Sequence, residues 1–315
     1  MKKVLLIGEP MALLIADRTG PLEEIEHFTR SMSGAEVNVA IGLSRLGFNV
    51  EYMTKLGDDP FGHYIFKKLR NANIGTQFIS FDKVYRTGIQ LKNKTDDGSD
   101  PYAPYYRKGS AASRITVEDI QRIDFSEIDL IHVTGIPPAL SLSNREATFA
   151  LIELAKSKGI IVTFDPNLRP ALWEDEETMK RVINELAFKA DVVLPGKEEG
   201  NILCGTKNFD KIAEFYQKHG VKTVIVKDGP GGAYVNHNGE SVYISGFKVD
   251  QVVDTVGAGD GFAVGVISGI LGGKDIRQTI IDANAIGAMQ VMNISDNEGL
   301  PTRKELDDFI SKQVI

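Results

Sequence analysis

Short apolar runs alternate with amphipathic stretches along most of this 315-residue chain. The continuous apolar runs, typical of strands buried on both faces, are Val4–Ile7, Asp129–Val133, Ile160–Phe164, Val192–Leu194 and Thr223–Val226. Helical periodicity is found between them in Glu36–Leu46, Phe61–Leu69, Asn144–Ser157, Glu177–Lys189 and Ile212–His219. The alternation predicts an α/β fold, a three-layer sandwich whose mainly parallel sheet lies between two layers of helices. Ligands of such sheets bind at the carboxyl ends of the strands, so functional residues are expected just after these runs.

Two segments depart from this alternation. Residues 11–30 and 80–110 contain short stretches of alternating apolar and polar residues, such as "MALLIAD" and "RTGIQLKNK", with polar turns. This pattern predicts a small antiparallel sheet that is set apart from the main one. Because no internal repeat and no Pro- or Ser-rich linker divides the chain, residues 1–315 are expected to form one domain with this small sheet as an elaboration.

Composition limits the kinds of molecule that the protein can bind and indicates its cellular compartment. A net charge of −7 disfavours a general affinity for nucleic acid or for anionic membranes. The first apolar run is too short for a signal peptide or a membrane span. Cys204 is the single cysteine, which excludes an internal disulfide and fits a reducing compartment. A cytoplasmic protein is therefore expected.

A glycine-rich turn is the most specific indication of chemistry in the sequence. Gly257-Ala258-Gly259-Asp260-Gly261 directly precedes the apolar run Phe262–Leu271. The glycines allow a tight turn whose free N–H groups, at the start of a helix, suit a phosphate or a developing oxyanion. A carboxylate at position 260 is unfavourable beside phosphate unless it accepts a proton from an attacking hydroxyl. An ordinary helix start with Asp260 as its cap explains the same residues, because a G-x-G pattern alone is weak evidence.

The stretch "DTVGAGDGF" resembles the C-terminal signature of the ribokinase-like (pfkB) carbohydrate kinases. The family's glycine-rich N-terminal signature resembles "SGAEVNVAIGLSRLG", residues Ser33 to Gly47, followed by "KLGDDPFG", residues Lys55 to Gly62. The resemblance extends over essentially the whole chain and identifies residues 11–30 and 80–110 with the family's lid. It implies transfer of the ATP γ-phosphoryl group to a sugar hydroxyl, with Mg²⁺.

Residue roles follow from this resemblance. Asp260 matches the general base, and Gly257, Ala258 and Gly259 match the anion hole. Asp254 matches a ligand of the monovalent-cation site, for K⁺, that many members have. Glu199 in "PGKEEG" matches the acid of an N-x-x-E motif near Mg²⁺, with Gly196 in place of the asparagine. The residues expected at the nucleotide are Asn167, Lys227, Asp228, Gly229, Gly231, Gly232, Gly257 and Gly259. A Gly- and Pro-rich hairpin turn is the simpler account of "VKDGPGGAYV".

Two arginines point to an acidic substrate. Arg107 follows two tyrosines at the end of the second lid segment, and Arg169 in "FDPNLRP" lies just beyond a predicted strand. An arginine can hold a carboxylate with two parallel hydrogen bonds, which a neutral sugar does not require. These stretches resemble the family members that phosphorylate 2-keto-3-deoxygluconate at its terminal hydroxyl. By that comparison the substrate residues are Gly34, Ala35, Asn38, Gln90, Tyr105, Tyr106, Arg107, Arg169, Asp260 and Asp296.

Alternatives remain open from the sequence. These kinases often carry a tyrosine at the position of Gln90, so the substrate class is better defined than the substrate. A fructokinase or another neutral-sugar kinase of the same family is the nearest alternative, and a sugar- or nucleotide-binding regulator without catalysis is the next. The exposed strand edges of the lid predict a homo-oligomer that pairs through it.

Overall fold

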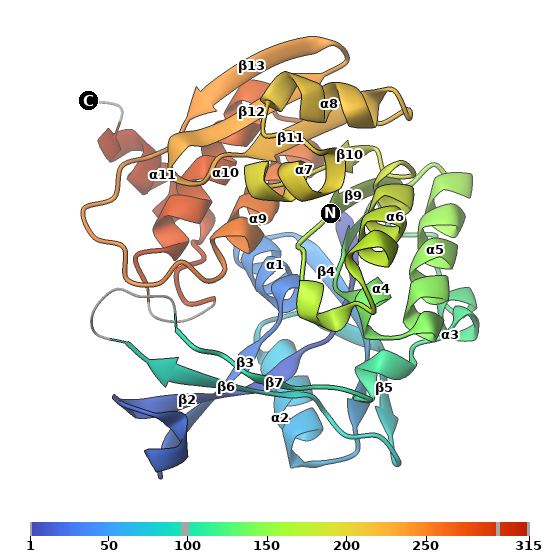
Figure 1. Ribbon diagram of the computed structural model, residues 1–315, viewed down its shortest axis with the longest axis vertical. Coiled ribbons are helices and arrows are strands. Elements are labelled where there is room, and N and C mark those ends of the chain that lie inside the picture. The colour runs from blue at the N-terminus through green and yellow to red at the C-terminus, as the bar shows by residue number, and fades with distance from the viewer. Residues whose placement is uncertain (1, 96–100, 294–296, 314–315) are drawn as a thin grey trace.

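The computed structural model describes residues 2–95, 101–293 and 297–313 and has two β-sheets (Figure 1). The large sheet has nine strands in the order β13-β12-β11-β10-β9-β8-β1-β4-β5. Its strands are β1 (Lys3–Ile7), β4 (Asn49–Gly57), β5 (Gly75–Asp82), β8 (Leu130–Thr134), β9 (Ile161–Asp165), β10 (Val192–Val193), β11 (Thr223–Lys227), β12 (Gly232–His237) and β13 (Glu240–Ser245). All neighbouring pairs are parallel except those that β12 makes with β11 and β13. The predicted mainly parallel sheet is therefore confirmed.

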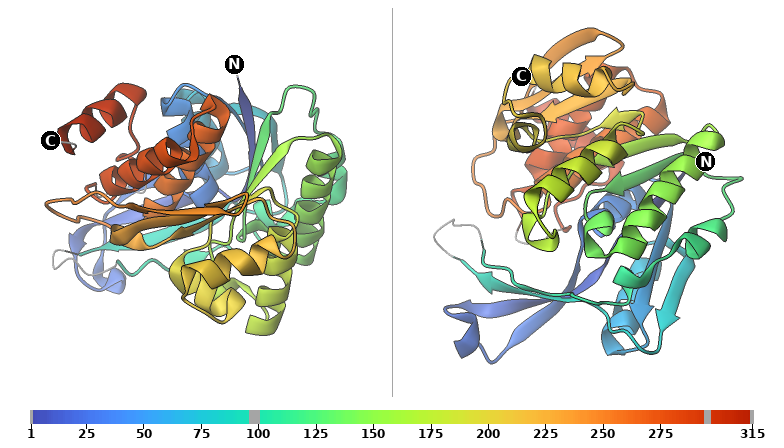
Figure 2. Two further views of the ribbon diagram at one scale, coloured as in Figure 1. Left: turned by 90° about the horizontal axis from the view of Figure 1, so that it is seen from above. Right: turned by 45° about the vertical axis from the view of Figure 1, so that its right-hand side comes forward.

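Helices cover both faces of this sheet, as the view from above in Figure 2 shows. One layer contains α1 (Ala35–Arg45), α2 (Pro60–Asn71), α9 (Ala258–Gly272), α10 (Ile276–Gln290) and α11 (Arg303–Gln313). The other contains α3 (Val117–Gln121), α4 (Pro137–Leu140), α5 (Leu142–Ser157), α6 (Glu176–Ala187), α7 (Lys197–Cys204) and α8 (Phe209–Gln217). Each layer buries its own apolar cluster against the sheet, which is the three-layer sandwich that the alternation predicts.

The second sheet has four strands in the order β3-β2-β6-β7. These are β2 (Met11–Thr19), β3 (Phe28–Ser33), β6 (Ile89–Lys94) and β7 (Tyr105–Tyr106), so both expected segments contribute to it. Two details of the prediction are wrong. β2 and β6 pair in parallel, because the chain between them crosses through α1, β4, α2 and β5. Residues 80–82 belong to β5 at the edge of the large sheet.

Helix α9 packs unusually close to its neighbour α10. At Gly265 an added Cβ atom would overlap the backbone of Ala283, and at Gly269 it would overlap the side chain of Thr279. Glycines at four-residue spacing therefore let the two backbones approach, and they fix the helix whose first turn carries Asp260. In the described parts of the chain, no helix, α9 included, is long and apolar enough to cross a membrane.

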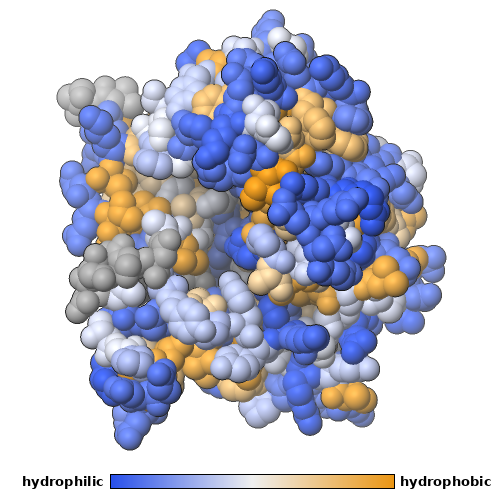
Figure 3. Space-filling model, viewed as in Figure 1, coloured by the Kyte–Doolittle hydropathy of each residue, from blue (hydrophilic) through white to orange (hydrophobic). Residues whose placement is uncertain are grey.

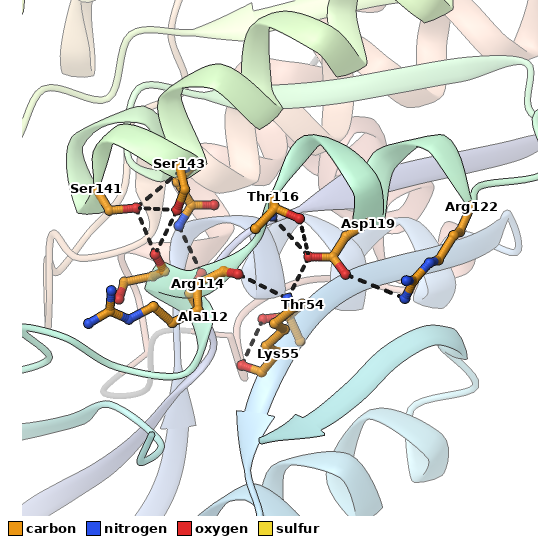
Figure 4. A network of polar contacts seen from close by, with 11 residues as sticks. Thr54, Lys55, Ala112, Arg114, Thr116, Asp119, Arg122, Ser141 and Ser143 are labelled. Atoms are coloured by element: carbon orange, nitrogen blue, oxygen red, sulfur yellow. Dashed lines mark hydrogen bonds and ion pairs between the residues drawn. The ribbon is translucent and has the colours of Figure 1, made fainter. Parts of the chain in front are cut away.

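A polar network fastens the chain where it returns from the small sheet to the body (Figure 4). Lys55 on β4 donates to the carbonyl of Arg114 at 2.9 Å and pairs with Asp119 at 2.5 Å. Asp119 also accepts a hydrogen bond from the backbone N–H of Thr116 at 2.9 Å, which caps α3. The network fixes the small sheet's connection to the large one.

Candidate active site

Loops after four strands of the large sheet converge at one edge, beside the first turns of α1 and α9. They border a cavity of about 490 Å³, and the face of the molecule seen in Figure 3 is hollowed between the body and the small sheet. Predicted site residues that border it are Gly34, Ala35, Asn38, Gln90, Tyr105, Arg107, Asn167, Arg169, Glu199, Lys227, Gly257, Gly259 and Asp260. The structure thus brings together residues from both ends of the chain at the expected end of the sheet.

Asp260 lies in the first turn of α9 and is buried. Its Oδ2 accepts a hydrogen bond from Asn38 Nδ2 at 2.8 Å, and its Oδ1 accepts a longer one from Asn167 Nδ2 at 3.4 Å. Burial raises the pKa of Asp260 to about 6, the bond from Asn38 opposes this rise, and the charge of nearby Asp165 adds to it. Such a carboxylate is ionised at neutral pH and has a higher proton affinity than an exposed one, as a general base requires.

The turn before Asp260 has the backbone that an anion hole needs. Gly257 is the N-cap of α9 with φ of 82°, a left-handed conformation that favours glycine. The N–H groups of the following residues open the helix, where intrahelical acceptors are lacking. Among them, that of Ala258 makes a long bond of 3.4 Å to the Thr255 carbonyl. Gly257 and Gly259 border the cavity, whereas the Ala258 amide is in part engaged, so the anion hole stays a prediction that this backbone is compatible with.

A partly buried lysine, whose side chain is 17% exposed, lies beside this turn. Lys227 Nζ is 2.7 Å from Asp165 Oδ2, and a Cβ atom added to Gly259 would lie 3.8 Å from the same ammonium. Burial lowers the pKa of Lys227, but the carboxylates of Asp165 and Glu199 more than compensate, so the pKa is raised. Lys227 therefore stays protonated next to the glycine turn, where its ammonium is paired with Asp165 and can also bind phosphate oxygens.

A second cavity, of about 380 Å³, meets the first at this point. Lys227, Thr255 and Gly259 border both cavities. The second one is lined mostly by small and apolar side chains, with Gly229 and Gly232 among the predicted nucleotide residues. Of the other residues predicted at the nucleotide, Asn167 and Gly257 border the first cavity, and Asp228 and Gly231 border neither. Gly231 lies beside Tyr243, and Asp228 is held by Lys197 at 3.1 Å and by the Tyr243 hydroxyl at 3.0 Å, so its carboxylate serves the turn.

Arg107 and Arg169 differ in their surroundings. Arg107 is buried, and its Nε and one terminal nitrogen both lie 2.6 Å from Glu9 Oε2. Its charge is thus largely neutralised before any substrate arrives. Arg169 is partly buried, donates to the Leu168 carbonyl at 2.9 Å, and has no carboxylate partner among the residues that the structure describes. The electrostatic attraction for an acidic substrate therefore comes mainly from Arg169.

One other substrate prediction, Tyr106, is not supported by position. The Tyr106 side chain is 65% exposed and does not border the cavity, because successive side chains of β7 point to opposite faces. Asp296 lies outside the described residues. Gln90 does border the cavity and accepts a hydrogen bond from the Ser33 hydroxyl at 2.6 Å.

Sequence reasoning missed three acidic residues of this region. Glu9 follows β1 and Asp165 ends β9, and this position at the carboxyl ends of strands could have identified both as site residues. Glu36 lies in α1 under the cavity and accepts a hydrogen bond from the Thr134 hydroxyl. Burial raises the pKa of Glu36 to about 7. Its position gave no signal, because a glutamate in the first turn of a helix is usually exposed.

The two residues expected at metal ions already have partners. Glu199 accepts backbone hydrogen bonds through both oxygens, from Leu168 at 2.8 Å and from Gly196 at 2.6 Å, and burial raises its pKa. Both oxygens are thus engaged, and the described ranges contain no group of three acidic, His or Cys residues that could hold a metal ion, so a role of Glu199 at Mg²⁺ stays a prediction. Asp254 forms a buried ion pair of 2.6 Å with Lys92.

Comparison with known proteins places this site in a family. Residues 1–303 match the model of the pfkB family carbohydrate kinases. The chain is 44% identical over 307 residues to 2-dehydro-3-deoxygluconokinase of Bacillus subtilis (strain 168), covering 97% of this chain and 94% of that protein. It is 33% identical over 312 residues to the enzyme of the same name from Thermoproteus tenax, covering 98% of this chain and 94% of that protein.

The crystal structure of a PfkB protein from Polaromonas sp. JS666 has the same architecture. Its TM-score is 0.89 at 42% identity, and the match covers 98% of this chain and 99% of that one. The glycine turn, the buried Asp260 and the two adjoining cavities thus occur in a fold shared with sugar kinases. The chain belongs to the pfkB family of carbohydrate kinases.

Proposed function

We propose that this kinase transfers the γ-phosphoryl group of ATP to the terminal hydroxyl of 2-keto-3-deoxygluconate. The observation that carries the proposal is the meeting of two different cavities at the glycine turn. One is rich in charged side chains and contains Asp260 and Arg169, whereas the other is mostly apolar and suits a nucleotide base. The relative from B. subtilis supports the choice of sugar acid.

The residues of the site define the steps. Asp260 takes the proton of the hydroxyl as its oxygen attacks the γ-phosphorus, and the bond from that phosphorus to the bridging oxygen breaks, so that ADP leaves. The backbone N–H groups of Gly257 and Gly259 and the ammonium of Lys227 stabilise the charge on the transferred group. Arg169 binds the substrate carboxylate, and Asn38 holds Asp260 in position.

Kinases of this family use Mg²⁺ with ATP, and the ion neutralises phosphate charge when it is bound. Because Glu199 is engaged by backbone N–H groups, we propose that the ion reaches this site on the nucleotide phosphates with its waters. The small sheet contributes Gln90 and Tyr105 to the sugar cavity, so we propose that it serves as the lid. Association through the lid's edge strands stays a prediction.

A coupled assay of ADP formation tests the proposed reaction. Purified protein is supplied with ATP, Mg²⁺ and, in separate runs, 2-keto-3-deoxygluconate, fructose, ribose or adenosine. The expected result is the highest kcat/KM for the keto acid. The fructokinase alternative predicts the highest value for fructose. This alternative is supported by the similarity of the chain to a fructokinase structure from Vibrio cholerae O395, with 28% identity and a TM-score of 0.85. If none of these compounds is phosphorylated, the remaining interpretation is a sugar- or nucleotide-binding protein without catalysis.

The pH dependence gives an independent check on Asp260. Because its pKa is raised to about 6 and a general base must be ionised, kcat/KM should fall as the pH is lowered through about 6 and level off above about pH 7. The substrate's own carboxyl group is ionised throughout this range. The measurement is the profile between about pH 5 and about pH 8. A midpoint near the ordinary value of an exposed carboxylate would contradict the role of the buried one.

A further inference from the structure

A buried ion pair joins the lid to the loop in front of the glycine turn. Lys92 is on β6, in the lid, and Asp254 is in the loop between β13 and α9. The Lys92 ammonium is 2.6 Å from Asp254 Oδ2, and the two side chains are only 5% and 7% exposed. A lysine and an aspartate are buried to this degree only when each compensates the charge of the other.

Asp254 organises the backbone that leads into the anion hole. Its Oδ1 accepts a hydrogen bond from the Val256 N–H at 3.0 Å, one residue before Gly257. The N–H groups of Val253 and Asp254 both donate to the Val291 carbonyl, at 2.8 and 3.2 Å. These bonds fix the loop before α9 against the end of α10. Whatever cation neutralises Asp254 also supports the placement of the anion-hole amides.

The same carboxylate is the one expected, from the family resemblance, to bind a monovalent cation. Here its Oδ2 faces an ammonium and its Oδ1 faces a backbone N–H. A potassium ion on this carboxylate would place a second positive charge beside the buried Lys92 ammonium, 2.6 Å from the same carboxylate, which is electrostatically unfavourable. The side chains present do not fit an additional ion on Asp254.

We propose that the Lys92 ammonium takes the place of a monovalent cation beside the anion hole, so that turnover of this kinase is independent of K⁺. The proposal rests on the proposed kinase activity. A lysine supplies the same single positive charge as K⁺, but it is part of the chain and therefore always present. It also lies two residues from Gln90 on the same face of β6, so one strand of the lid provides both a cavity residue and the cation.

The wild-type enzyme gives the first test. Turnover of 2-keto-3-deoxygluconate is measured in tetramethylammonium chloride and in KCl at equal ionic strength, after removal of residual K⁺. Equal rates in the two salts are expected. A several-fold higher rate in KCl would overturn the proposal, whereas absence of turnover in both salts would contradict the proposed function and not the cation assignment.

The second test uses Lys92→Met, which keeps the length of the side chain and removes its charge. In tetramethylammonium chloride, turnover should fall on the order of 10²-fold, because the misplaced loop no longer presents the anion-hole amides. KCl should restore most of this activity, since a free ion can now occupy the vacated position on Asp254. The exposed Lys94, on the same strand, gives the matched control Lys94→Met, which should behave as wild type in both salts.

Thermal unfolding provides a readout that does not depend on catalysis. The unfolding temperature of Lys92→Met should rise with added KCl, whereas that of wild type and of Lys94→Met should be the same in the two salts. If Lys92→Met is equally active and equally stable in both salts, Lys92 does not replace a cation. If the variant does not fold in tetramethylammonium chloride, its recovery or continued failure in KCl decides the same question.

Discussion

Replacing Asp260 by asparagine is expected to lower kcat by about 10²- to 10⁴-fold with little change in the affinity for ATP. Asparagine has the same size, and its amide oxygen can still accept the hydrogen bond from Asn38. What it loses is the capacity to take a proton from the attacking hydroxyl. The measurement is kcat with 2-keto-3-deoxygluconate at saturating ATP, together with the dissociation constant of ATP. Comparable turnover in the variant would remove Asp260 from the role of base.

Stability separates this loss from unfolding. The pKa of Asp260 in the folded chain is about 6, above the ordinary value of 3.8, so the folded state disfavours the charged form. The contribution of this group to stability therefore decreases as the pH rises from about 4 to about 6 and stays low above that range. Asparagine removes this cost. The unfolding temperature of Asp260→Asn near pH 7 should be no lower than that of wild type. Asp250→Asn, exposed in the loop before α9, is the control with unchanged kcat.

Replacing Arg169 by methionine is expected to raise KM for 2-keto-3-deoxygluconate by roughly 10- to 100-fold, the value of a hydrogen-bonded charge pair. Arg169 is the better choice of the two arginines, because it forms no ion pair with a described carboxylate, although its charge also lowers the pKa of Asp260. KM for ATP and the unfolding temperature should change little. Arg277→Met, exposed on α10 away from the cavity, is the matched control. An unchanged KM for the keto acid would favour a neutral sugar as the substrate.

Arg107 requires a different design. Its removal alone would leave Glu9, which is 1% exposed, as an unpaired buried carboxylate and would destabilise the fold. The double variant Glu9→Gln/Arg107→Met avoids that problem. If Arg107 also contacts the substrate carboxylate, KM of the double variant stays raised above that of Glu9→Gln alone. Equal values in the two variants would assign Arg107 a purely structural role.

The central architecture could be predicted because its signals are local. The runs at β1, β8, β9, β10 and β11 are continuous and apolar, as strands buried on both faces must be. The alternating pattern of β2 and β6 likewise indicated a separate sheet. Their parallel pairing could not be predicted, because it depends on the path of the chain between them. The boundary at β5 was missed because its edge position leaves it partly exposed, with a pattern similar to that of the small sheet.

The sequence by itself determined the family, the position of the glycine turn and the presence of Asp260 at the start of a helix. Motifs and local backbone preferences depend on contiguous residues, so these features could be predicted without knowledge of any tertiary contact. Charge pairing between distant segments was decided only by the tertiary structure. Arg107 and Asp254 have the expected chemistry, but they meet Glu9 and Lys92, residues 98 and 162 positions away. The strength of a buried charge depends on its neighbours in space, and those neighbours are set by the fold.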